Sequence, residues 1–254
     1  WKADVNKLGF GVRLGVDVPA EGRGLVPSAK YYDKIYRPGG WRSTTVASLA
    51  IGQGELLATP LQLANIEATI ANRGYYIRPH LVKAVGERKL IRKKYTEKHY
   101  VDIDARHFGP VIDGMEDAVN KSWGTAIESR IPGILMAGKT GTVQNSRGKN
   151  HSVFIGFAPR DNPKIAIAVI VENAGYGGQY AAPIASYLTE LYLKDSVSIS
   201  RRAAMDWIKY KNLLPELKAK VPVKPKPTDT PKKVTKQPVT LQTAGKRPNS
   251  VPRS

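Results

Sequence analysis

Three consecutive segments of the chain have the pattern of β-strands, and they restrict the fold more than any other feature of the sequence. They are ILMAGKTGTVQN, SVFIGFA and KIAIAVIVE, at 134–145, 152–158 and 164–172. In the second and third segments the side chains alternate with a period of two residues, which is typical of strands. The short, turn-rich sequences SRGKN and PRDNP join the segments, so we expect an antiparallel meander.

The strongest helical signal lies upstream of these strands, at 60–73. Thr59 and Gln62 have the spacing of a capping box, Pro60 suits the first helical position, and Gly74 is suited to the residue after the helix. Apolar residues at helical spacing predict further helices. These are expected at 107–122 and 182–194, with a shorter one at 201–214.

The remaining parts of the chain show weaker patterns. Residues 1–58 are rich in Gly and Pro, and we expect short extended pieces separated by turns. Residues 75–95 are consistent with strands around a basic turn. Together these elements predict an α/β fold in which an antiparallel sheet is flanked by helices.

The sequence AGKTGTVQN, at 137–145, places a lysine where it could bind an anion. Two known motifs include a lysine in this context, and they predict different functions. Residues 133–140 fit the phosphate-loop pattern G-x-x-x-x-G-K-[ST]. That motif requires a strand before the loop and a helix after it. Here the residues before Lys139 have the pattern of a strand, and GTVQNSRGKN after it is a poor start for a helix. The sequence therefore disfavours a nucleotide site.

The second motif is the Lys-Thr-Gly triad of serine acyl-transferases, which lies on a strand beside the active site. Lys139 supplies a fixed positive charge, Thr140 and Thr142 supply hydroxyl donors, and Gly141 allows close approach of a substrate backbone. The edge of a strand also offers free N–H and C=O groups to an extended peptide. The triad therefore predicts a site that binds a peptide carboxylate.

Longer stretches of the chain, across about 5–194, resemble class B penicillin-binding proteins. They include GVRLGVDVPAEGRGLVPS, ASLAIGQGELLATPLQLANIEATIANRGYYIRPHLVKAV and HSVFIGFAP with the later IAIAVIVENAGYGGQYAAPIA. The IGQG before ATPLQLA resembles the cell-elongation branch, penicillin-binding protein 2. The resemblance implies the serine β-lactamase type of fold and a penicillin-sensitive peptidoglycan D,D-transpeptidase. It also implies the C-terminal part of the transpeptidase domain at 1–195, followed by a basic Lys/Pro-rich tail at 196–254.

The resemblance also assigns roles to the residues of the triad strand. Lys139 is expected to be the catalytic cation that orients the peptide carboxylate and maintains the protonation balance of a serine–lysine pair. Thr140, Gly141 and Thr142 are expected to bind substrate, with the Thr142 N–H forming half of the oxyanion hole. Gln144 is a further substrate-binding candidate, although a solvent-facing polar residue explains it equally well.

Two motifs that the family chemistry needs are missing from the sequence. The one Ser-x-x-Lys, at 146–149, follows the triad in a predicted turn, so we interpret Ser146 as a turn residue and expect no nucleophile here. There is no Ser-x-Asn. Trp1 stands where an initiator methionine would, so we expect a piece of a longer protein that is inactive alone. A noncatalytic module that binds peptidoglycan peptides remains the alternative if no Ser-x-x-Lys is encoded upstream.

Composition narrows the cofactors and partners. Cysteine is absent, which excludes thiolate metal sites, and the four histidines show no metal spacing, so no metal or organic cofactor is expected. The net charge of +19 includes a Lys- and Pro-rich tail that we expect to be disordered from about 215. For the family, the implied partners are D-Ala-D-Ala stem peptides, β-lactam antibiotics and a cell-elongation glycosyltransferase, not nucleic acid. The implied location is the periplasmic face of the inner membrane, with the anchor outside this chain.

Overall fold

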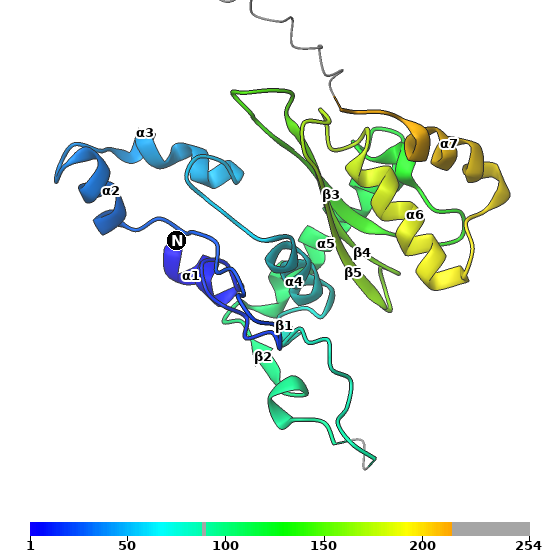
Figure 1. The fold of residues 1–254 in the computed structure, drawn as a ribbon, viewed down its shortest axis with the longest axis horizontal. Coiled ribbons are helices and arrows are strands. Elements are labelled where there is room, and N and C mark those ends of the chain that lie inside the picture. Colours follow the sequence, from blue (N-terminus) through cyan, green and yellow to red (C-terminus); the bar gives the residue numbers. More distant parts are fainter. Residues whose placement is uncertain (88–89, 215–254) are drawn as a thin grey trace, which may run out of the picture. The chain divides into compact units, whose positions relative to one another are not determined.

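The centre of the fold is a three-stranded antiparallel sheet. In the computed structural model, which describes residues 1–87 and 90–214, the strands are β3 (Ala137–Val143), β4 (His151–Ala158) and β5 (Ile165–Val171). Their order is β3-β4-β5 (Figure 1). The register pairs Gly141 with Val153 and Val153 with Ile170. The three predicted strands and their antiparallel pairing are confirmed, with ends that differ by at most three residues.

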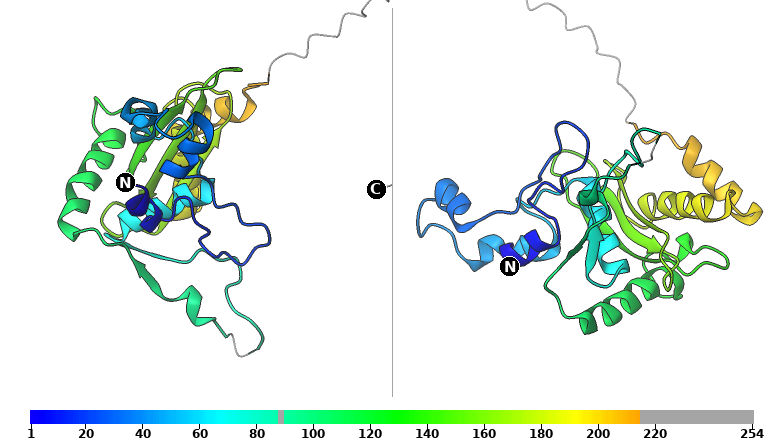
Figure 2. Two further views of the ribbon diagram at one scale, coloured as in Figure 1. Left: turned by 90° about the vertical axis from the view of Figure 1, so that its left-hand side faces the viewer. Right: turned by 90° about the horizontal axis from the view of Figure 1, so that it is seen from below.

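Helices cover both faces of this sheet (Figure 2). On one face the buried Phe154 packs with three alanines of α6 (Ala181–Lys194), namely Ala181, Ala182 and Ala185. Small residues on the helix allow it to approach the ring closely. On the other face, Phe157 packs with residues of α4 (Pro60–Ala71) and α5 (Phe108–Asn120). The helices predicted at 60–73, 107–122 and 182–194 are therefore confirmed.

The start of α4 ties the N-terminal segment to the core. Thr59 accepts from the Gln62 amide, and the Gln62 side chain accepts from the Thr59 amide, which completes the predicted capping box. The Gln62 side-chain amide group also lies 2.9 Å from the carbonyl oxygens of Gly9, Val12 and Arg23. Gln62 is 1% exposed, so these bonds satisfy a buried polar group.

Residues 1–58 contain more helix than the sequence predicted. The expectation of extended pieces and turns was wrong for four segments, which are α1 (Lys2–Lys7), α2 (Ala29–Tyr36), α3 (Ser43–Val46) and the 3-10 helix η1 (Ala47–Ile51). α2 is capped by Ser28, whose side chain accepts from the Tyr31 amide. The helix α2 is stabilised by Tyr32, which is buried and packs against Trp41. Local apolar spacing does not reveal this contact.

The predicted strands around a basic turn are present in part. β1 (Tyr75–Ile77) pairs with β2 (Lys98–Tyr100), which lies beyond the predicted segment, and a single bridge joins Val85 to Leu90. Short 3-10 helices also occur at η2 (Lys93–Tyr95), η3 (Ala105–His107) and η4 (Ile127–Ser129).

The chain after α6 forms one more helix, α7 (Ile199–Tyr210), where 201–214 was predicted. A compact unit spans Trp1–Leu213 and therefore includes α7. The domain boundary predicted at 195 stays a prediction. The disorder predicted from about 215 concerns residues outside those that the structure describes. Across the described part of the chain, no helix has the length and apolar character needed to cross a membrane.

The core contains one carboxyl group without a partner. Glu67 of α4 is 1% exposed, and neither of its carboxyl oxygens has a hydrogen-bond partner. Burial disfavours the charged form and raises the pKa of Glu67 from 4.5 to about 8. The side chain is therefore neutral in the folded protein at neutral pH.

This burial predicts a pH-dependent loss of stability. Between pH 4.5 and about 8, the unfolded chain releases the Glu67 proton while the folded chain keeps it, so the folded state becomes less stable as pH rises. We expect wild type to lose stability relative to Glu67→Gln by up to about 1.4 kcal/mol per pH unit in this window. Urea unfolding at several pH values measures the difference. The exposed-site variant Glu97→Gln is the control, and parallel curves for wild type and Glu67→Gln would contradict the prediction.

Candidate functional site

The triad Lys139-Thr140-Gly141 lies on β3, which is an edge strand among the described residues because its one sheet partner is β4. In an antiparallel pair, alternate residues direct their N–H and C=O groups away from the partner strand. Lys139 is exposed, and its ammonium donates to the carbonyl oxygen of Thr140 at 2.8 Å. A cation thus lies at the open edge of the sheet, beside backbone groups of the same strand.

The two threonine hydroxyls are placed by the segments around β3. Thr140 Oγ1 lies 2.9 Å from Thr125 Oγ1, and Thr142 Oγ1 accepts from the Gly177 amide at 3.4 Å. A hydroxyl group has one donor and two acceptor positions. Thr142 therefore retains a proton to donate, and both threonines are half-buried on the strand that carries the cation.

Glycines allow the chain to pack closely at this site. A Cβ at Gly138 would lie 2.3 Å from the Phe154 ring, and one at Gly141 would lie 3.3 Å from Val153 Cβ. A Cβ at Gly177 would lie 2.4 Å from the Val153 carbonyl oxygen and 2.5 Å from that of Gly141. The segment 175–180 therefore lies directly against β3 and β4 because it presents no side chain there.

Ser152 of β4 fixes this segment, and sequence reasoning missed it. Its hydroxyl donates to the Tyr176 carbonyl at 2.9 Å and accepts from the Ala181 amide at 3.0 Å. Ser152 is fully buried, so both bonds lie in the core. A polar residue in an otherwise apolar strand was the available signal.

The turn between β3 and β4 contains the remaining candidates. Gln144 is exposed just after β3, and Ser146 is exposed in the turn, not on a helix. His151 opens β4, and its Nδ1 accepts from the Asn173 amide at 3.0 Å. These side chains lie beyond the triad, so the structure brings Lys139, Thr140, Gly141 and Thr142 together and leaves Gln144 at the rim.

The geometry excludes a phosphate loop. The chain after Lys139 continues as β3 to Val143 and then returns as β4, so the helix that would cradle a phosphate is replaced by strands. Among residues 1–87 and 90–214, no group of three His, Cys, Asp or Glu side chains could hold a metal ion. The chemistry available at the edge of β3 is the binding of an anionic, extended ligand.

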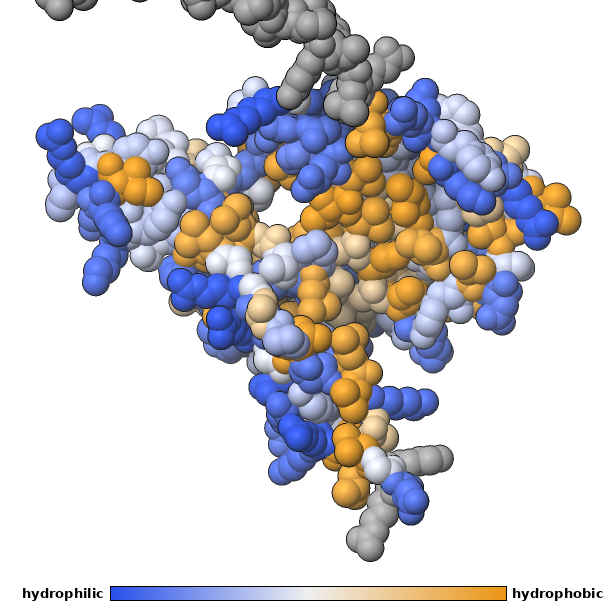
Figure 3. Space-filling model, in the orientation of Figure 1, coloured by the Kyte–Doolittle hydropathy of each residue, from blue (hydrophilic) through white to orange (hydrophobic). Residues whose placement is uncertain are grey.

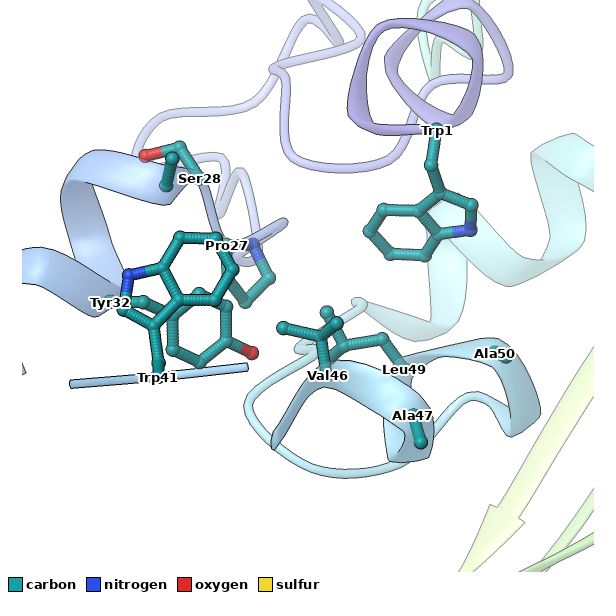
Figure 4. Close-up of a pocket in the computed structure, with 10 residues that line it drawn as sticks. Trp1, Pro27, Ser28, Tyr32, Trp41, Val46, Ala47, Leu49 and Ala50 are labelled. Carbon is teal, nitrogen blue, oxygen red and sulfur yellow. The ribbon is translucent and has the colours of Figure 1, made fainter. Parts of the chain in front are cut away.

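A hollow in another part of the molecule, away from the triad, is lined by apolar side chains. It has a volume of about 430 Å³ and lies between Trp1, Pro27, Tyr32, Trp41 and Val46 (Figure 4). Two of its rings are tied to acidic residues: Tyr32 donates to Glu55, and Trp41 donates to Asp33. Burial and the bond to Glu55 raise the pKa of Tyr32 to about 12. The polar atoms of these rings are therefore already engaged.

The chain is similar to proteins of one family over most of its length. Residues 1–190 match the penicillin binding protein transpeptidase domain. The chain is 34% identical over 203 residues to peptidoglycan D,D-transpeptidase MrdA of Acinetobacter baumannii, covering 72% of this chain and 30% of that protein. Its identity to MrdA of Haemophilus influenzae is 33%, covering 76% of this chain and 32% of that protein. The chain thus spans about a third of these relatives.

The chain is also similar in structure to solved penicillin-binding proteins. PBP2 of Pseudomonas aeruginosa in complex with WCK 5153 has a TM-score of 0.68 at 34% identity, covering 78% of this chain and 44% of that chain. PBP2 of Helicobacter pylori in complex with MreC has a TM-score of 0.64 at 30% identity, covering 76% and 35%. A peptidoglycan synthase complex that coordinates polymerization and crosslinking has a TM-score of 0.63 at 30% identity, covering 77% and 33%.

The close contact of Gly177 with β3 and β4 predicts opposite effects for two glycine substitutions. Gly177→Ala forces the segment 175–180 away from the sheet, and we expect a loss of about 1–3 kcal/mol. Gly114, on the exposed side of α5, has no atom within 4 Å of its would-be Cβ. Because alanine favours helix, Gly114→Ala is expected to stabilise by about 0.5–1 kcal/mol. Urea unfolding measures both, and equal effects would contradict the prediction.

Proposed function

Since the chain belongs to the penicillin-binding transpeptidase family, we propose that it forms the peptide-binding part of a peptidoglycan D,D-transpeptidase that acts in cell elongation. The observation that carries this proposal is the position of Lys139, Thr140 and Thr142 on the exposed edge of β3. A metal or an organic cofactor has no part in the proposed chemistry.

The proposed substrate is a stem peptide that ends in D-Ala-D-Ala. An extended peptide adds to an open strand edge through backbone hydrogen bonds. Its terminal carboxylate would lie near the Lys139 ammonium and the hydroxyls of Thr140 and Thr142, since charge-assisted hydrogen bonds favour that placement. Gly141 leaves space for the peptide backbone. Gln144, exposed at the rim, is positioned to contact the donor or the acceptor peptide.

The proposed reaction is acyl transfer through a serine that lies outside these 254 residues. The serine oxygen attacks the carbonyl of the penultimate D-Ala, its proton goes to a neighbouring base, and the terminal D-Ala leaves as the amine after protonation. The amine of an acceptor peptide then displaces the serine. Water in place of that amine gives carboxypeptidase activity. The Thr142 N–H and the serine's own N–H would stabilise the oxyanion.

The other edge of the sheet, formed by β5, indicates that the domain is incomplete. Within the described part of the chain, β5 pairs with β4 alone, and six of its seven residues are half-buried although all seven are apolar. An apolar edge strand with free backbone groups is a template for further pairing. Figure 3 shows apolar residues gathered over the sheet and α6 in this view. We propose that polypeptide outside this chain completes the sheet and supplies the nucleophile.

The proposed partners follow from the same assignment. β-Lactams mimic the acyl donor and would acylate the same serine. One similar structure contains MreC and another is a peptidoglycan synthase complex, which supports a glycosyltransferase partner in elongation. The proposed location is the periplasmic face of the inner membrane, with an anchor outside this chain.

The role of Lys139 is tested in the protein encoded by the complete reading frame. We expect Lys139→Ala to lower the rate of acylation by a fluorescent penicillin by about 10²-fold, because it removes a charge that holds the carboxylate. Lys149→Ala, which removes an exposed lysine in the following turn, is the matched control. Equal rates for wild type and Lys139→Ala would rule out this role.

The absence of a nucleophile is tested with the 254-residue chain. We expect no covalent labelling by the same penicillin, since Ser146 and Lys149 lie in an exposed turn. Mass spectrometry of the incubated chain checks the result. Labelling of a serine within the chain would contradict the proposal. If the complete reading frame also fails to react, a noncatalytic peptide-binding module becomes the better account.

A further inference from the structure

The helix α7 lies beyond the family match, which ends at residue 190, yet it is fixed to the domain by a buried ion pair. The Arg201 guanidinium contacts the carboxylate of Glu190 on α6, and these side chains are 9% and 0% exposed. Arg201 also donates to Ser186 Oγ at 2.6 Å. Breaking such a pair leaves an uncompensated buried charge, so α7 is held in one place.

The contacts at its two ends give the direction of α7. Arg201, near its start, reaches Glu190, whereas Trp207, near its end, stacks on Tyr180 just before α6. α7 therefore runs back along α6, as Figure 1 shows. Tyr180 comes three residues after Gly177, whose amide donates to Thr142. The end of α7 is thus joined through the segment 175–180 to the triad strand.

An aromatic and cationic surface forms at this end of α7. The rings of Trp207 and Tyr180 are 6.2 Å apart and nearly parallel, at 16°. Trp207 is 56% exposed and Tyr210 is 75% exposed. The Lys211 ammonium lies 5.2 Å from the Trp207 ring centre, and the Lys209 ammonium lies 5.0 Å from that of Tyr210. We call Tyr180, Trp207, Lys209, Tyr210 and Lys211 the α7 patch.

Exposed aromatic rings with lysine ammoniums over them suit one kind of ligand, which would take the place of the lysines on the ring faces. A pyranose ring has an apolar C–H face that packs on an aromatic face, and its hydroxyl groups remain in water. Lysines beside the rings attract carboxylates on the same polymer.

We infer that the α7 patch binds the glycan strand of peptidoglycan, whose attached stem peptides carry carboxylates, next to the peptide site. The identity of this polymer rests on the proposed function. The outward face of α7 presents Ala203, Ala204 and Asp206 around Trp207, and the exposed Ile199 lies at the start of the helix. Binding of this face to a lipid surface is tested separately below. One or two sugar rings need no more than the exposed aromatics.

The inference is tested with the 254-residue chain by co-sedimentation with purified peptidoglycan sacculi and by calorimetric titration with chitotetraose, a neutral tetrasaccharide. We expect Trp207→Ala to weaken both by about five- to tenfold, since one stacking contact is lost. Trp123→Ala, which removes another exposed tryptophan, is the matched control and is expected to bind as wild type does. Circular dichroism shows whether each variant is folded.

A double variant tests the charge of the patch, and it is measured whether or not Trp207→Ala folds. We expect Lys209→Ala with Lys211→Ala to weaken binding to sacculi at low salt and to leave chitotetraose binding within about twofold of wild type, because the neutral sugar has no carboxylate. Equal binding by wild type and Trp207→Ala, or no binding of either glycan by wild type, overturns the inference. Trp207-dependent binding to phosphatidylglycerol vesicles or to DNA without chitotetraose binding also overturns it.

These results are separable from a failure of the proposed function. If penicillin acylates the complete protein and Trp207→Ala binds glycan as well as wild type does, the glycan inference alone is overturned. If glycan binding depends on Trp207 and the complete protein does not react with penicillin, the transpeptidase proposal alone is overturned.

Discussion

The exposed edge of β3 is the constraint on which the site depends. A peptide can add to a sheet where a strand has free backbone groups, and β3 keeps them because β4 is its one partner in the described structure. Two features hold β3 in that position. The missing side chain of Gly138 leaves room for the Phe154 ring, and Phe154 packs in turn on the alanines of α6. The open edge is therefore held rigid by a dense core behind it.

Close packing at a glycine also explains how the segment 175–180 contributes to the site. Gly177 lies against the backbone of β3 and β4, and Ser152 binds both sides of it through Tyr176 and Ala181. Because Ser152 is buried, its bonds are protected from competition by water. The position of the Thr142 hydroxyl thus depends on a buried serine of the neighbouring strand, with which Thr142 is paired.

The elements that the sequence predicted are those whose signals are local. The period-two strands and the capping box at Thr59 and Gln62 depend on neighbouring residues, and the structure has them. α2 was missed because it is short and is stabilised by the contact of Tyr32 with Trp41, nine residues away. Ser152 was missed because its partners lie 24 and 29 residues along the chain. Contacts of this kind arise from packing, which a spacing pattern does not contain.

The hydrogen bond from Lys139 to the Thr140 carbonyl links the charge of the site to the backbone of β3. An exposed ammonium gains little from a neutral carbonyl that water can replace, so the bond costs little to break. A carboxylate arriving at the edge of β3 offers the same ammonium a stronger, charge-assisted bond. The Thr140 carbonyl is then released for the backbone of an extended ligand. We propose that binding of the carboxylate and pairing of the strand are coupled through Lys139, which would favour ligands that present both a terminal carboxylate and an extended backbone.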